Sequence, residues 1–444
     1  MSREATPTKR PTERALLCGL ILEDQAEEFA GPLTEAAGLV EAAGSEVVGD
    51  RFLQRRTRPV PSTLLGSGKV EEVKAEIDRI APDVVVVDND LTPAQVRNLE
   101  KIWCKRVVDR SELIMDIFAR RAQTRQARLQ VELAQTQYLM PRLRRMWTHL
   151  ERMEGAIGTR GPGETQLETD RRLIKKRITD LRRELQVIEE RKQRQVRSRA
   201  EEFTIGLVGY TNAGKSSLLN RLTGSTEMAE DMLFATLDTR TRRWALGDSR
   251  TVLLSDTVGF LGRLPHHLVA SFQATLEEAL EVDLLLHVID AADPDAPAHL
   301  EAVDQVLRGA ARGRRDEILV WNKIDALGGQ LPPDLLTSLE GRESVRCSVH
   351  TGEGLDELTA LVARRLDRRS ALVEIRIPFH EGASLASARR VARILEETHD
   401  ATDGTLLRGW VGERELGNFE RTCGRDVTVR VLEAAEEPFA PRDR

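Results

Sequence analysis

Eight consecutive residues, 209–216, have the types and spacing of a phosphate-binding loop. They read GYTNAGKS and fit the pattern G-x-x-x-x-G-K-S without a mismatch. The apolar stretch 204–208 predicts a strand before the loop, and residues 217–222 have helical spacing after it. Backbone amides at such a turn converge on phosphate oxygens at a helix N-terminus. We therefore expect Lys215 to contact the β- and γ-phosphates and the Ser216 hydroxyl to bind Mg²⁺.

A second element follows a predicted strand at residues 253–258, which reads LLSDTV and runs into Gly259. In a nucleotide-binding α/β domain, an aspartate at this place can hold a Mg²⁺-bound water, and the glycine amide can meet the γ-phosphate. Asp256 and Gly259 are therefore predicted to sense the γ-phosphate.

A third element, Asn322-Lys323-Ile324-Asp325, follows a predicted buried strand at residues 318–321. The Asp325 carboxylate can accept from both N1–H and the exocyclic amine of guanine, and adenine offers neither donor. Because an acceptor left without its partner is costly, a site built this way rejects adenine. We expect the preference for guanine to depend mainly on Asp325.

The order and spacing of these elements resemble those of TRAFAC GTPases, and three more stretches narrow the resemblance to the HflX family of ribosome-associated GTPases. They are the glycine-rich GTRGPGETQLE at 158–168, the FATLD at 234–238, similar to the family's switch I, and the 256–278 stretch, similar to its switch II. The resemblance covers residues 14 to 370, and it implies that Thr236 is the second protein ligand of Mg²⁺. Residues 348–352 resemble the loop S-A-x-x-G that recognises guanine O6, with Val349 in place of the usual alanine.

The motifs and the resemblance together give three sets of expected site residues. The catalytic set is Lys215, Thr236, Gly259 and Asn212, and the metal set is Ser216, Thr236 and, through a water, Asp256. The nucleotide-binding set is Gly209, Tyr210, Thr211, Asn212, Ala213, Gly214, Lys215, Ser216, Ser217, Phe234, Ala235, Thr236, Leu237, Asp238, Asp256, Thr257, Val258, Gly259, Asn322, Lys323, Ile324, Asp325, Ser348, Val349 and His350.

Phe260 stands where Ras-like enzymes carry the glutamine that orients the attacking water. A phenyl ring cannot hydrogen-bond that water, so we expect slow hydrolysis in isolation. Asn212 occupies the position that, in potassium-dependent TRAFAC relatives, helps to hold a monovalent cation against the phosphates. Asparagine is equally a residue type that tolerates a strained turn. Whether Asn212 holds K⁺, in addition to the Mg²⁺ expected at the phosphates, therefore stays open.

Charge is distributed unevenly along the chain. The net charge of the 444 residues is −6, yet residues 101–200 hold 25 Lys and Arg against 13 Asp and Glu. Such a local excess of positive charge is expected of a surface that binds a polyanion such as RNA. Two long arginine-rich helices are predicted there, at 110 to about 154 with an interruption near Pro141, and at 164 to about 200. The expected RNA-binding residues are Arg142, Arg144, Arg145, Arg160, Arg171, Arg172, Lys175 and Lys176.

The glycine-rich stretch between these helices would form the tip of a basic hairpin. In the HflX family this subdomain is implied to enter the large ribosomal subunit near the peptidyl transferase centre and to strain the contacts between subunits. From the residues alone, an antiparallel coiled coil for self-association and a pair of ordinary solvated helices both remain alternatives. We expect GTP and GDP, the large subunit and its rRNA as partners of a chain that is a monomer in solution.

The predicted fold class is α/β, with five segments. They are a disordered tail (1–13), an N-terminal α/β domain with a parallel sheet (14–109), the basic helical hairpin (110–200), a GTPase domain with a mixed, mostly parallel sheet (201–370), and a C-terminal α+β domain (371–444). In the N-terminal domain we expect one strand over 46–52, and in the C-terminal domain a helix over 385–397. The glycines at 66 and 68 favour a turn before the helix from Val70, although the family resemblance leaves a second nucleotide site open.

Other features limit the class of protein. No apolar stretch approaches the eighteen residues of a membrane span, and the polar N-terminus lacks a signal-peptide core, so we expect a soluble cytoplasmic protein. The four cysteines lie far apart and predict buried free thiols rather than disulfides or a zinc site.

We expect a Mg²⁺-dependent GTPase that binds the large ribosomal subunit and splits or remodels ribosomes. A GTP-switched protein for another RNA, and a self-assembling switch, are the two alternatives.

Overall fold

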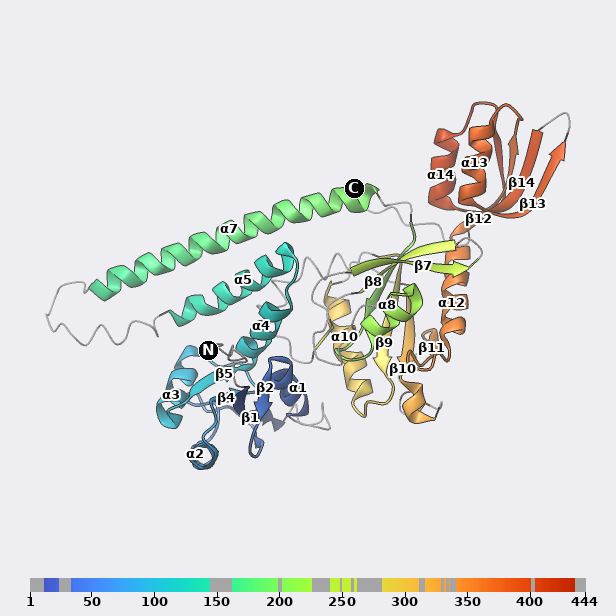
Figure 1. The fold of residues 1–444 in the computed structure, drawn as a ribbon. Coiled ribbons are helices and arrows are strands. Elements are labelled where there is room, and N and C mark those ends of the chain that lie inside the picture. The colour runs from blue at the N-terminus through green and yellow to red at the C-terminus, as the bar shows by residue number, and fades with distance from the viewer. Residues whose placement is uncertain are drawn as a thin grey trace, which may run out of the picture.

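A computed structural model of the chain describes residues 12–23, 33–143, 162–198, 202–225, 240–247, 250–256, 259–261, 282–310, 316–328, 331–332, 335, 341–400 and 404–435. Within these residues the chain forms three sheets, one in each of three successive parts of the sequence (Figure 1). The predicted fold class is confirmed: an N-terminal α/β part with a long helical hairpin precedes a P-loop domain and a small α+β domain.

The N-terminal sheet is built around the long strand β1 (Glu13–Leu22). The parallel strands β4 (Val84–Val87) and β5 (Arg106–Asp109) extend it on one side, and β2 (Ser45–Val47) and β3 (Phe52–Arg56) share its other edge. The single strand predicted over 46–52 is wrong, because the chain turns at Gly49, whose φ of 73° is left-handed, before β3 begins.

Four helices cover this sheet on its two faces. Helices α1 (Thr34–Ala42) and α4 (Arg110–Arg121) pack on one face, and α2 (Ser67–Ile80) and α3 (Pro93–Trp103) pack on the other. Alternate residues of β1 enter the two cores, Leu17 with α1 and α4 and Leu16 with α2 and α3. Helix α2 begins at Ser67 rather than at the predicted Val70, so Gly66 caps the helix as expected, whereas Gly68 lies within its first turn.

The hairpin consists of α5 (Arg125–Leu139) and the 37-residue α7 (Pro162–Ser198), which lie side by side (Figure 1). Leu129 and Leu133 of α5 pack against Ile178 and Leu181 of α7. The helix predicted from 110 to about 154 is instead interrupted at residues 122–124, where the Thr124 hydroxyl accepts from the Ala127 amide and starts α5. A short 3-10 turn, η2 (Met140–Arg142), contains Pro141.

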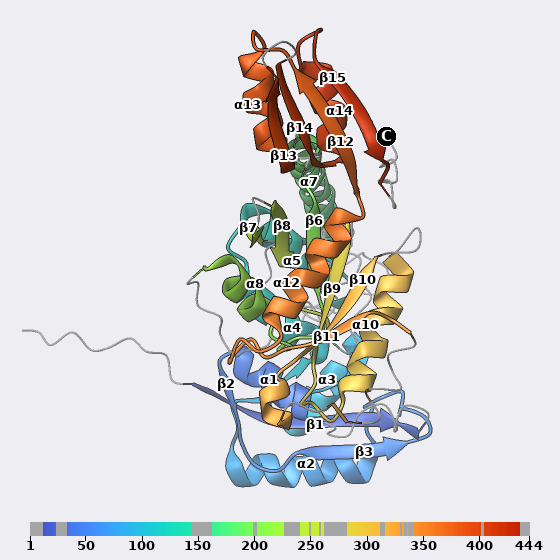
Figure 2. The same cartoon turned by 90° about the vertical axis from the view of Figure 1, so that its right-hand side faces the viewer.

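The P-loop domain has a six-stranded sheet in the order β11-β10-β9-β6-β8-β7. The strands β6 (Thr204–Val208), β8 (Arg250–Asp256), β9 (Leu284–Asp290), β10 (Glu317–Asn322) and β11 (Ser344–Arg346) are parallel, and β7 (Arg240–Gly247) is antiparallel to β8. Helices α8 (Lys215–Thr223) and α12 (Leu355–Asp367) cover one face, and α10 (Ala296–Ala310) and the short η3 (Ile324–Leu327) lie on the other (Figure 2).

The C-terminal part is an antiparallel sheet in the order β13-β14-β12-β15, with two helices on one side (Figure 1). Its elements are β12 (Ser370–Ile377), α13 (Gly382–Val391), β13 (Ala392–Asp400), β14 (Gly404–Gly412), α14 (Glu413–Thr422) and β15 (Thr428–Glu433). The helix predicted over 385–397 is therefore wrong after Val391. The segment from Ala392 pairs with β14 instead, since tertiary pairing overrides local propensity.

Cys18 and Cys347 are buried free thiols as predicted, whereas Cys104 is exposed. None of the described helices is both long and apolar enough to cross a membrane.

Candidate nucleotide-binding site

The predicted motifs of the P-loop domain meet at one edge of its sheet. The phosphate loop follows β6, Asp256 ends β8, Asn322 ends β10, and Ser348 follows β11. These strands are parallel, so their carboxyl ends lie together, which is where open α/β sheets bind ligands.

The phosphate loop owes its shape to backbone conformations that glycine and asparagine tolerate. Gly209 has a φ of 147°, and a Cβ added there would lie 2.1 Å from the Val288 carbonyl oxygen. Gly214 precedes α8 with a φ of 96°, and Asn212 is left-handed at 62°. The interpretation of Asn212 as a residue that tolerates a strained turn is thus confirmed. This conformation does not decide whether Asn212 also helps to hold a monovalent cation.

Lys215 and Ser216 begin α8 with their side chains in a shared polar cluster. The buried Lys215 ammonium donates to the carbonyl oxygens of Gly209 at 3.0 Å and Tyr210 at 2.6 Å. The Ser216 hydroxyl donates to a carboxylate oxygen of the fully buried Asp256 at 2.7 Å. Burial lowers the pKa of Lys215 to about 8, and the nearby charge of Asp256 opposes that shift.

The start of the predicted switch II lies directly against the phosphate loop. The Phe260 amide donates to the Gly209 carbonyl at 3.1 Å, and the Thr211 amide donates to the Phe260 carbonyl at 2.7 Å. Gly259 is so close that a Cβ there would lie 3.1 Å from the Lys215 ammonium. The Phe260 ring is buried in a core cluster, so it cannot orient a water molecule.

Asn322 connects the predicted base-recognition loops to the phosphate loop. Its side-chain amide donates to the Ala213 carbonyl at 2.9 Å, and its side-chain oxygen accepts from the Val349 amide at 3.1 Å. Lys323 forms an ion pair with Asp290 at 2.7 Å. Asp325 is exposed, as its predicted contact with a bound base requires. Ile324 is buried in η3 and supports the loop from within.

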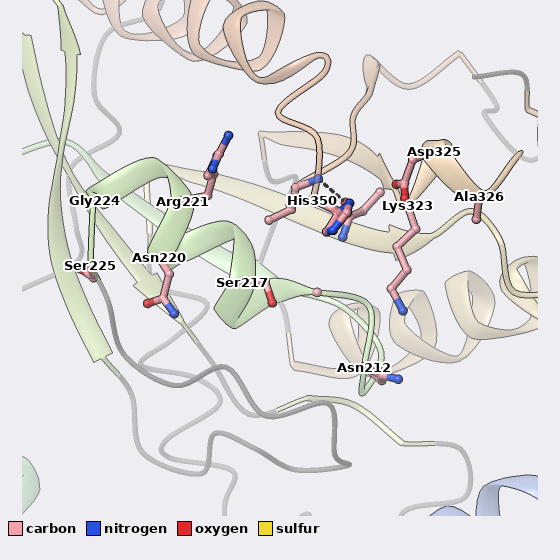
Figure 3. A pocket seen from close by; sticks show the side chains of 13 residues that line it. Asn212, Ser217, Asn220, Arg221, Gly224, Ser225, Lys323, Asp325, Ala326 and His350 are labelled. Carbon is pink, nitrogen blue, oxygen red and sulfur yellow. Dashed lines mark hydrogen bonds between the residues drawn. The ribbon is translucent and has the colours of Figure 1, made fainter. Parts of the chain in front are cut away.

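An open cavity of about 980 Å³ lies between these loops and α8 (Figure 3). Eight predicted residues line it: Asn212, Gly214, Ser217, Asn322, Lys323, Asp325, Val349 and His350. Ser348 is fully buried and does not line it; its hydroxyl accepts from the Thr351 amide at 3.1 Å. The motifs missed five lining residues, Asn220, Arg221, Gly224, Ser225 and Ala326. Asn220 and Arg221 lie one helical turn after Ser216 and Ser217, and that spacing could have identified them.

Several predicted site residues lie outside the described residues. In the P-loop domain these are Phe234, Ala235, Thr236, Leu237, Asp238, Thr257 and Val258, and in the hairpin they are Arg144, Arg145 and Arg160. Their predicted roles stay predictions.

The predicted RNA-binding residues divide into two groups. On α7, Arg172, Lys175 and Lys176 are exposed. Arg171 is half-buried, and its spacing of three and seven residues from Ile174 and Ile178 places it on the side of α7 that packs against α5. Arg142 is different and corrects the prediction. Its guanidinium donates to Asp109 at 3.0 Å and to the Leu91 carbonyl at 2.7 Å, and it lies 3.5 Å over the Tyr138 ring. These contacts occupy Arg142 inside the N-terminal part, so it is not available to a phosphate.

Three family models match successive parts of the chain. They are described as "GTP-binding GTPase N-terminal" over residues 31–119, "GTP-binding GTPase Middle Region" over 121–199, and "50S ribosome-binding GTPase" over 204–323. A solved GTP-binding protein from Sulfolobus solfataricus, in complex with GDP, is 23% identical, with a TM-score of 0.43, over 80% of this chain and 98% of that chain.

Curated relatives match nearly the whole chain. The GTPase HflX of Lacrimispora saccharolytica is 41% identical over 92% of this chain and 96% of the relative. The GTPase HflX of Magnetococcus marinus is 42% identical over 93% of each, and that of Escherichia coli K12 is 45% identical over 79% of this chain and 82% of the relative. The phosphate loop, the predicted guanine-recognition loops and the start of the predicted switch II lie at one sheet edge. In agreement with these relatives and family models, this protein is a GTP hydrolase that belongs to the HflX GTPase family.

Proposed function

We propose that this GTPase binds the large ribosomal subunit and, in its GTP-bound form, splits or remodels ribosomes, with hydrolysis permitting release. The observation that carries the proposal is the exposed basic surface of α7, formed by Arg172, Lys175 and Lys176, on a hairpin joined directly to a GTPase domain. The matching family model is described as a 50S ribosome-binding GTPase, which supports the same partner. We propose that it acts in the cytoplasm as a monomer.

The two helices of the hairpin, α5 and α7, cover each other's apolar sides within one chain. The leucines and isoleucines between α5 and α7 bury their apolar sides against each other, which leaves the charged sides outward. This arrangement favours a surface for an anionic partner over a seam for self-association, the alternative that the sequence left open.

The phosphate end of the cavity fits a bound nucleotide. The hydroxyl oxygen of Thr211 is buried and, among the described residues, has no hydrogen-bond partner, although it belongs to the phosphate loop. Buried polar atoms normally have partners, so a phosphate oxygen is a fitting one. We propose that Lys215 leaves the two loop carbonyls for the β- and γ-phosphates, and that the Gly259 amide follows the γ-phosphate.

The same end fits Mg²⁺. Ser216 and Asp256 place a hydroxyl and a carboxylate oxygen 2.7 Å apart, and oxygen ligands are those that Mg²⁺ prefers. We propose that Ser216 and Thr236 hold the ion directly and Asp256 holds it through a water. When bound, the ion neutralises charge on the β- and γ-phosphates.

Catalysis in this proposal depends on positioning and electrostatics, because Phe260 cannot orient the attacking water. A partner or a cation would then have to accelerate hydrolysis. Asn212 lines the cavity (Figure 3), and its side-chain oxygen is a ligand type that suits a weakly held K⁺. Turnover should be faster in K⁺ than in Na⁺ at equal ionic strength, and equal rates would remove this part of the proposal.

Sedimentation of purified ribosomes through sucrose gradients tests the function. With a non-hydrolysable GTP analogue the wild-type chain should co-migrate with large subunits and reduce the 70S peak, and with GDP it should do neither. Co-migration with protein-free structured RNA but not with subunits would favour the RNA-binding alternative.

The basic surface has its own matched test. Substituting Lys175→Ala with Lys176→Ala should weaken subunit binding and lower the slope of log affinity against log salt by about two. The control is Arg97→Ala with Lys101→Ala, which removes the same charge from the exposed side of α3. An equal loss in both variants would indicate a general charge effect and contradict the proposed surface.

A further inference from the structure

The second residue of the phosphate loop, Tyr210, is held by the N-terminal part of the chain. Its hydroxyl donates to a carboxylate oxygen of Glu35 on α1 at 2.8 Å, across a separation of 175 residues in sequence. The Tyr210 ring also stacks on His299 of α10, with centroids 3.7 Å apart and 13° between the planes. Tyr210 is only 6% exposed. A residue of a ligand-binding loop is thus fixed from two sides.

The acceptor on α1 is itself fixed. The other carboxylate oxygen of Glu35 accepts from Arg110, whose guanidinium also donates to Asp88 at 2.5 Å. Arg110 is 3% exposed and begins α4, directly after β5. The buried Arg110 is held by Asp88 and pairs with the half-buried Glu35, so this ion pair orients the carboxylate that accepts from the Tyr210 hydroxyl. Such charge-assisted hydrogen bonds are the stronger kind.

A second contact fixes the same loop through switch II. Phe260 is hydrogen-bonded to the residues on both sides of Tyr210, and the next residue, Leu261, is 4% exposed within the apolar core of the N-terminal part. The Tyr210 carbonyl meanwhile accepts from Lys215. The tethered residue therefore lies between the N-terminal part and the lysine that is expected to meet the phosphates.

We propose that Glu35 is a positioning residue for nucleotide binding: through the Tyr210 hydroxyl it fixes the phosphate loop, so that docking of the N-terminal part raises the affinity for guanine nucleotides. The inference rests on the proposed placement of the phosphates at this loop. A loop held before binding loses less conformational freedom when the phosphates arrive, and the gain appears in affinity rather than in the rate of the chemical step.

Tyr210→Phe is the sharpest variant, because it removes one oxygen atom and keeps the ring that stacks on His299. It should raise the Kd for GDP and for a non-hydrolysable GTP analogue by about three- to tenfold, measured by titration calorimetry on the full chain. KM for GTP should rise by the same factor, with kcat changed by less than about twofold. Amide hydrogen exchange of residues 209–214 in the nucleotide-free protein should become faster.

Substitutions at Glu35 separate the hydrogen bond from general stability. Glu35→Ala should raise the Kd like Tyr210→Phe, Glu35→Gln should recover part of the loss because it keeps an acceptor, and Glu35→Ala with Tyr210→Phe should be no worse than Glu35→Ala alone. The control is Glu112→Ala, which breaks the ion pair of Arg106 and Glu112 in the same part of the chain and should leave Kd unchanged.

The outcomes are distinct. If the wild-type chain binds no guanine nucleotide, the proposed function fails and this inference fails with it. If the wild type binds and the folded Tyr210→Phe variant binds equally well, even with a lower Tm, the inference alone is overturned and the contact is merely structural. If Glu35→Ala does not fold, Tyr210→Phe decides the question by itself.

Discussion

Nucleotide binding should take up a proton at Lys215. Burial lowers the pKa of Lys215 from 10.5 to about 8 in the empty loop, where its partners are two uncharged carbonyls and the charge of Asp256. Phosphates placed beside the ammonium favour its charged form and return the pKa toward or above 10.5. At pH 8 the empty site is about half protonated, so binding should take up about half a proton, falling to about 0.1 at pH 7 and rising to about 0.9 at pH 9.

The same shift has a definite sign for folding. Because the pKa of Lys215 is lower in the folded than in the unfolded chain, the unfolded chain binds more protons between pH 8 and 10.5. The contribution of Lys215 to the unfolding free energy of the nucleotide-free protein therefore rises as the pH increases from 8 to 10.5. Bound nucleotide should remove that rise, since the ammonium then stays charged in the folded state as well.

Titration calorimetry of GDP in two buffers with different heats of ionisation measures the uptake directly. The phosphate groups are already largely ionised at pH 8, so they contribute little. His350→Gln is the control, because His350 is a histidine that lines the cavity, and this variant should keep the uptake of about half a proton at pH 8. An uptake that is absent at pH 8, or that does not change between pH 7 and 9, would refute the assigned position of Lys215 and the reasoning from its burial.

Three further substitutions test other parts of the structure. Asp325→Asn should reduce the preference for GTP over ATP by at least about a hundredfold in competition binding, and it should change unfolding free energy by less than about 0.5 kcal/mol because the side chain is exposed. Gly354→Ala should lower the urea midpoint by the equivalent of about 3 kcal/mol, because the φ is +75° and the new Cβ would lie 1.9 Å from the Arg346 carbonyl oxygen; Gly382→Ala, in open space, is its control. Leu181→Ala should destabilise the contact of α5 and α7 by about 2–5 kcal/mol and speed limited proteolysis of the hairpin, whereas the exposed Leu173→Ala should not.

Local motifs made much of this structure predictable. The phosphate loop and the strands that carry Asp256 and Asn322 follow from short patterns, because glycines, a lysine and buried strands must occur at fixed spacing to form such a site. The hairpin follows from long arginine-rich helical periodicity, although Thr124 starts a new helix where periodicity alone suggested continuity.

Features that depend on distant contacts could not be predicted. The segment after Val391 contains good helix formers, and only the presence of β14 makes it a strand. Arg142 looked like one more surface arginine until Asp109 and Tyr138 were placed around it. The hydrogen bond between Tyr210 and Glu35 joins two residues whose proximity is a property of the folded chain, and no pattern of spacing carries that information.

Helix α7 gives the molecule a long mechanical arm. Its 37 residues rise about 55 Å along one axis, and it ends at Ser198, only a few residues before β6 and the phosphate loop. A rotation of about 5° at that end would displace the far end by about 5 Å, the scale of one helical turn. Movements at the nucleotide too small to disturb the sheet could therefore become displacements large enough to break contacts at the far end of the arm.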